Sequence, residues 1–152
     1  EFKIQYVNPH VMGTRCHMLA MYVVLENHIT SLCDTPEAYE GQKGFEVLCT
    51  VPGTWDEIRV PLAEMNEHVT VARRNGSDWW VGSLNNGTER RLRLRLEFLG
   101  EGEYEATIYT DAEDTDRNPN HLDKQVRKVT AKDDIDLNLK KDGGALLHIR
   151  KL

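Results

Sequence analysis

Side chains that could do chemistry gather at two places in the first part of the sequence. Asp34 directly follows the short apolar run 29–33. If that run is a buried strand, Asp34 lies at its C-terminal end, where β/α barrels carry their reacting groups. Capping of the next helix is an open alternative for Asp34. Trp55, Asp56 and Glu57 form the second group, in which an aromatic ring and two acids can stack on a sugar ring and bind its hydroxyls.

These residues are predicted to lie near a substrate and are not predicted to be catalytic. Adjacent acids such as Asp56 and Glu57 cannot both face one point without strain, which argues against the paired carboxylates of a glycosidase. A structural loop is the alternative for 55–57. Trp79 and Trp80 are a third candidate, as an aromatic face for carbohydrate. Adjacent strand residues point to opposite faces, so at most one of the two is expected to be exposed.

Five acids between positions 111 and 123 are the remaining cluster of potential ligands, since carboxylate oxygens suit calcium. Their spacing does not match an EF-hand loop, which needs a glycine at its sixth position and a terminal glutamate. We interpret the segment as an acidic loop and predict no metal ligand in the chain. The three cysteines, Cys16, Cys33 and Cys49, include no CxxC pair and are predicted to be buried free thiols.

Composition narrows the class of protein. The chain has 152 residues and a net charge of -6, from 25 acids and 19 bases, which argues against a nucleic-acid binder. It begins with Glu-Phe and shows no charged-then-apolar leader, so we expect an excised or processed piece. The apolar run 16–25 is too short to span a bilayer, and no membrane span is predicted.

The elements that would position the first candidates are helical. Thr14 is expected to cap a helix over 16–25 that is apolar almost all round and therefore covered by protein on most sides. A buried strand over 29–33 and a helix beginning at Pro36 follow, the latter broken near Gly41 and Gly44. Helix, strand and helix in this order are typical of an α/β barrel or a doubly wound sheet, yet no neighbouring strand is available nearby. The first third of the chain is therefore predicted to be the edge of a larger body.

The second part of the sequence changes to a period of two. Alternation over 91–98 places leucines on one face and arginines on the other, and about seven such segments are separated by Asn-Gly and Gly-rich turns. Arg91, Arg93 and Arg95 are expected to pair with the acids at 101, 103 and 105 on a neighbouring strand. Residues 63–152 are predicted to form an antiparallel all-β sandwich, after a loose connector over 54–67. The fold class is thus an α+β fragment: a helical remnant followed by an antiparallel all-β sandwich.

Six ordered stretches make the chain resemble the C-terminal part of a family 97 glycoside hydrolase, the bacterial α-glucosidase and α-galactosidase group. The resemblance covers nearly all of 8–150. It rests on TRCHMLAMYVV (14–24), LCDTPEAY (32–39), VPGTWDE (51–57), VTVARRNGSDWWVGSL (69–84), FLGEGEYEATIYTDA (98–112) and DRNPNHLDKQV (116–126). Members are similar in plan, with an N-terminal β-sandwich, a central (β/α)₈ barrel and a C-terminal β-sandwich. The resemblance implies that residues 1–62 are the last elements of that (β/α)₈ barrel and that residues 63–152 are the C-terminal sandwich.

The resemblance implies a calcium-dependent parent enzyme that hydrolyses α-glycosidic bonds in oligosaccharides. The catalytic and calcium-binding glutamates of the family precede this stretch, and none of Glu26, Glu37, Glu40, Glu46 or Glu57 matches a catalytic motif. No catalytic residue and no cofactor is therefore predicted here, and the piece is expected to be inactive alone. Its expected partners are the upstream barrel and N-terminal domain, together with further copies of itself, in a periplasmic or secreted bacterial protein. A carbohydrate-binding module and a purely structural interaction domain are the alternatives.

Overall fold

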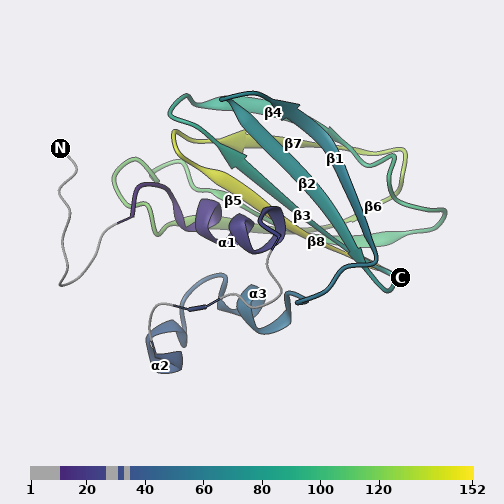
Figure 1. Cartoon of the computed structure of the whole chain (residues 1–152), viewed down its shortest axis with the longest axis horizontal. Coiled ribbons are helices and arrows are strands. Elements are labelled where there is room, and N and C mark those ends of the chain that lie inside the picture. Colours follow the sequence, from purple (N-terminus) through teal and green to yellow (C-terminus); the bar gives the residue numbers. More distant parts are fainter. Residues whose placement is uncertain (1–10, 27–30, 33–34) are drawn as a thin grey trace.

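The computed structural model describes residues 11–26, 31–32 and 35–152. Within these ranges three short helices precede eight strands (Figure 1). The helices are α1 (Arg15–Val24), α2 (Pro36–Tyr39) and α3 (Phe45–Thr50). The strands are β1 (Glu57–Glu64), β2 (His68–Asn75), β3 (Asp78–Asn85), β4 (Arg90–Arg95), β5 (Tyr104–Asp111), β6 (Leu122–Val129), β7 (Asp134–Leu139) and β8 (Gly144–Lys151).

The strands form two antiparallel sheets. The larger has the order β1-β2-β3-β8-β5-β6, and β4 pairs with β7 in the smaller. The main core lies between the sheets and contains alternate residues of the strands, such as Leu94, Leu137 and Leu147. This arrangement confirms the predicted all-β sandwich and its antiparallel class. Because six strands face only two, the inner face of the larger sheet is not covered over its whole width (Figure 1).

The outer face of the larger sheet is covered by α1 and α3 (Figure 1). A stripe on α1 is buried, at the i, i+3, i+4 and i+7 positions Cys16, Leu19, Ala20 and Val23. Together with Val47 of α3 it packs on Trp80, Tyr109, Leu122 and Leu146 of the sheet. One side of this helix is thus covered by protein, as predicted, and the cover is the sheet of the same chain. Met18, Met21 and Tyr22 lie outside the stripe and are partly exposed.

Local signals at the helix ends behave as predicted. The Thr14 hydroxyl accepts a hydrogen bond from the His17 N–H at 3.1 Å, and Pro36 occupies the first turn of α2. The predicted second helix is broken into α2 and α3 by Gly41 and Gly44, which have φ of +75° and +88°. Ser31 and Leu32 are described and lie in no strand, and the rest of the predicted strand 29–33 lies outside the described residues.

Two predictions in the sheet region are wrong. Residues 57–64 of the expected connector form β1, an edge strand paired with β2, so the predicted boundary between 62 and 63 falls inside a strand. Ile58, Val60 and Leu62 do alternate there with Glu57, Arg59 and Pro61, but a proline argues against a regularly paired strand. In the structure the pairing register shifts beside it, between Arg59 and Leu62. The arginine ladder pairs with β7 instead of the strand at 101–105: Arg91 contacts Asp136 at 2.6 Å, and Arg93 contacts Asp134.

Candidate functional site

The Trp55-Asp56-Glu57 group lies at the start of β1, beside the end of β2. Asp56 accepts a hydrogen bond from the Gly76 N–H at 2.7 Å. Glu57 accepts bonds from the side chains of Arg74, at 3.1 Å, and Arg59, at 2.8 Å. These bonds, the Arg74 bond most strongly, hold the pKa of the Glu57 carboxyl below its usual range. The two acids therefore fasten the start of β1 to the β2–β3 turn.

Trp55 is partly buried against the cluster between α1 and the sheet. The Arg73 guanidinium lies 5.8 Å from the centre of its ring, a cation–π contact. The contacts of Trp55, Asp56 and Glu57 are thus to the chain itself, and their role next to a substrate stays a prediction. Asp34 lies outside the described residues.

Trp79 and Trp80 do point to opposite faces, as the strand geometry requires. Both are buried, however. Trp79 packs in the core between the sheets against Phe98, and Trp80 stacks on His148 with ring centres 3.9 Å apart beneath the helices. The expectation that at most one of them is exposed is thus met, and neither offers an aromatic face to carbohydrate.

Asp111 forms a buried junction that the sequence interpretation missed. It is 7% exposed, and its Oδ2 accepts hydrogen bonds from the backbone N–H groups of Gly144, at 3.0 Å, and Lys140, at 3.2 Å. Burial raises the pKa of this carboxyl, although those bonds and the Thr14 hydroxyl favour its charged form. His17 Nδ1 lies 3.0 Å from the Gly143 carbonyl oxygen. The N-terminal end of α1 is thus joined to the β7–β8 turn.

Two consecutive glycines allow this close approach. A Cβ at Gly143 would lie 2.0 Å from Asp111 Oδ2, and one at Gly144 would lie 2.7 Å from the Cα of His17. The sequence signal was therefore the Gly143-Gly144 pair, which we interpreted only as a turn. Nothing in the sequence distinguished Asp111 from the other acids of the 111–123 segment.

The rest of the acidic segment makes local contacts. His121 Nδ1 lies 2.8 Å from Asp114 Oδ2, and its Nε2 lies 2.8 Å from Asn118 Nδ2. Among the described residues no group of three or more His, Cys, Asp or Glu side chains is arranged to hold a metal ion. The calcium that the family resemblance implies therefore has no fitting ligand set in the described part of the chain.

The thiols differ from each other. Cys16 lies on the buried stripe of α1, and burial raises the pKa of its thiol. Cys49 is exposed, so the prediction that it is buried is wrong. It lies on the outer side of α3, whose only buried residue is Val47. Cys33 lies outside the described residues.

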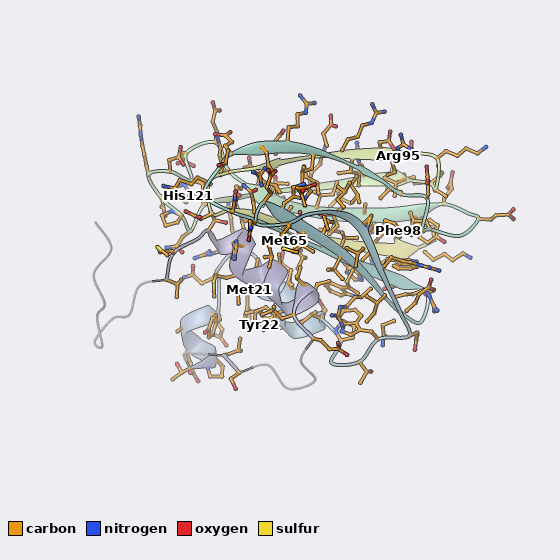
Figure 2. All side chains as sticks on the ribbon, turned by 45° about the horizontal axis from the view of Figure 1, so that its top comes forward. Met21, Tyr22, Met65, Arg95, Phe98 and His121 are labelled. Carbon is orange, nitrogen blue, oxygen red and sulfur yellow. The ribbon has the colours of Figure 1, made fainter. Side chains whose placement is uncertain are left out.

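A groove of about 710 Å³ opens between β1 and β4, where the smaller sheet does not cover the larger one. Val60, Pro61, Leu62 and Phe98 supply its apolar lining, with Arg59 and Arg95 among its charged residues. Figure 2 shows Arg95 and Phe98 at the same end of the molecule. An apolar floor with a charged margin suits a protein surface better than a small polar substrate.

No helix in the described part is long and apolar enough to cross a membrane.

Comparison with known proteins separates the strands from the helices that precede them. Residues 54–150 match the family described as glycosyl-hydrolase 97 C-terminal, oligomerisation. A retaining α-galactosidase of Bacteroides thetaiotaomicron is 32% identical over 146 residues, which are 95% of this chain and 22% of that enzyme. The chain thus spans about a fifth of the length of this relative.

Solved structures give the same picture. A family 97 enzyme of Pseudoalteromonas sp. strain K8, in complex with acarbose, superposes with a TM-score of 0.87 at 30% identity, over 92% of this chain and 23% of the enzyme. A β-arabinopyranosidase shares the fold, with a TM-score of 0.76 at 24% identity over 92% of this chain and 22% of its own. The chain belongs to the C-terminal domain family of the family 97 glycoside hydrolases. The suspected family is confirmed, and the matched domain begins three residues before β1.

Proposed function

We propose that the chain is the non-catalytic C-terminal part of a family 97 glycosidase that hydrolyses α-glycosidic bonds in oligosaccharides. In this proposal the sandwich holds copies of the enzyme together, and α1 to α3 belong to the last elements of the upstream barrel. The observation that carries it is the family match, which begins at Thr54 and leaves all three helices outside the matched domain.

The charged contacts of the described residues support a structural role. Glu46, for example, accepts hydrogen bonds from Lys124 at 2.7 Å and from the Tyr109 hydroxyl at 3.1 Å. Partial burial disfavours its charged form, but these bonds outweigh that effect and lower the pKa of Glu46. The contacts of Glu46 and Glu57 join elements of this chain to each other, as expected of carboxylates that are not catalytic.

The parent enzyme is proposed to take oligosaccharide substrates and to bind calcium through residues upstream of this chain. A periplasmic or secreted location in a bacterium is proposed with it. The α-galactosidase and the acarbose-bound enzyme found in the comparisons support α-linked sugars as the substrate class.

Hydrolysis of 4-nitrophenyl α-glucoside and α-galactoside tests the proposal. We expect the complete protein that contains this chain to cleave at least one of them and this chain alone to cleave neither. Turnover by this chain alone would contradict the non-catalytic assignment. A complete protein that cleaves neither α-linked substrate but cleaves a β-linked one would contradict the substrate class.

A further inference from the structure

The exposed large apolar residues of the matched domain are concentrated on one edge. Within residues 54–150 they are Ile58, Val60, Met65 and Val126. The first three lie on β1 or in the turn that follows it. We infer that two copies of this chain meet through the β1 surface, defined as Ile58, Val60, Met65 and the groove between β1 and β4. The inference rests on the proposed oligomerisation role and names its surface.

The two edge strands of the larger sheet, β1 and β6, differ in how they are protected from pairing with another chain. The exposed middle of β6 carries charged residues, such as Lys124 and Arg127, whose side chains bond Glu46 and the Asp134 carbonyl. Such charges discourage pairing with another chain. β1 carries charged residues too, Glu57, Arg59 and Glu64, but Ile58 and Val60 between them are exposed apolar side chains. Pro61 and the register shift beside it disfavour backbone pairing between copies, so the contact is made by side chains.

The groove gives those side chains a rigid place to bind. Leu62 and Phe98 line it and also pack on the main core, where Phe98 lies 4.9 Å from the ring of Trp79. Val60 lines the groove but is 57% exposed. Rigid, half-open apolar sites of this kind are typical of the anchor positions in protein interfaces.

The charges beside the groove favour a second copy as the partner. Arg95 and Glu97 both line it, are 73% and 75% exposed, and are only loosely paired at 3.6 Å. In a two-fold contact each surface meets its own copy, so Arg95 of one copy can reach Glu97 of the other. A surface that carries both signs side by side is complementary to itself.

Sedimentation velocity on the whole chain tests the inference with matched variants. Val60→Glu alters the β1 surface. Val126→Glu places the same charge on β6, where Val126 is 53% exposed, and Leu25→Glu places it just after α1, where Leu25 is 50% exposed. Circular dichroism and thermal melting establish that each variant is folded. Because all three sites are half-exposed in the single chain, none of the substitutions should unfold it.

We expect the unmodified chain to dimerise and Val60→Glu to weaken the dimer by about 100-fold or more, since the contact would bury an unpaired charge. Val126→Glu and Leu25→Glu should leave dimerisation unchanged. A dimer that survives Val60→Glu overturns the β1 surface and leaves the oligomerisation role intact. An unmodified chain that stays monomeric at high concentration overturns both.

A charge exchange tests the two-fold geometry. Arg95→Glu alone should weaken the dimer, because like charges then face each other across the contact, and adding Glu97→Arg should restore it. Equal dimerisation in all of these variants would overturn the proposed pairing.

Discussion

The two faces of the six-stranded sheet are covered in different ways. The inner face is covered by β4 and β7, which come from the same matched domain, and the core there contains sixteen buried residues. The outer face is covered mainly by α1 and α3, which precede that domain, and its cluster contains eight buried residues among those that the structure describes. The inner core thus belongs to the sandwich itself, whereas the outer cluster joins the sandwich to the segment before it.

This difference predicts that similar substitutions have different effects on the two faces. Leu137→Ala in the inner core should lower the free energy of unfolding of the whole chain by about 3–5 kcal/mol, because a fully buried leucine leaves a cavity. Leu19→Ala on α1 should lower the free energy of unfolding by less, about 2–3 kcal/mol, because the short helices can shift and partly fill the cavity. Urea unfolding followed by circular dichroism measures both. A larger loss for Leu19→Ala would contradict the ranking of the two faces.

A smaller effect on the free energy of unfolding is expected from titration of Asp111, which lies where α1 meets the β7–β8 turn. Burial raises the pKa of this carboxyl in the folded chain. Its contribution to stability is therefore fully present below the unfolded pKa, about 4, and is lost as the pH rises through the folded value. Asp111→Asn keeps an oxygen for the Lys140 and Gly144 N–H groups and removes the titration.

Thermal melting of both proteins between pH 4 and pH 8 checks this prediction. The chain with Asp111 should gain stability relative to Asp111→Asn as the pH falls. Carboxyls with lowered pKa, such as Glu57, act in the opposite sense in both proteins and cancel in the difference. A difference that is constant with pH, or that grows as the pH rises, would contradict the burial of a titrating carboxyl at this junction.

The sequence predicted the inner face well and the outer face poorly, for physical reasons. Leu92, Leu94 and Leu96 alternate with arginines, so period two identifies a strand with one dry face. The run 145–147 is apolar without alternation, which is typical of a strand buried on both faces. That signal pointed to a covering layer on the outer face, but the helix over 16–25 is apolar nearly all round and did not reveal which stripe packs there.

The candidate site was predictable only in part. The residue types at 55–57 suggested a sugar contact, but Arg59 and Arg74, which bind Glu57, come from β1 and β2. β1 itself shows alternating apolar residues at 58, 60 and 62, but Pro61 between them favoured the interpretation as a connector. Contacts between residues far apart in the sequence, such as Asp111 with Gly144, depend on how the strands pair. The spacing of neighbouring residues in the sequence does not predict them.

Native-state hydrogen exchange tests the central claim, that the helices form a separable cover on a self-sufficient sandwich. We expect the amides of α1 to exchange through a local opening whose free energy is clearly below that of β3, β5 and β8, which should exchange only on global unfolding. Equal free energies of opening for α1 and these central strands would contradict it.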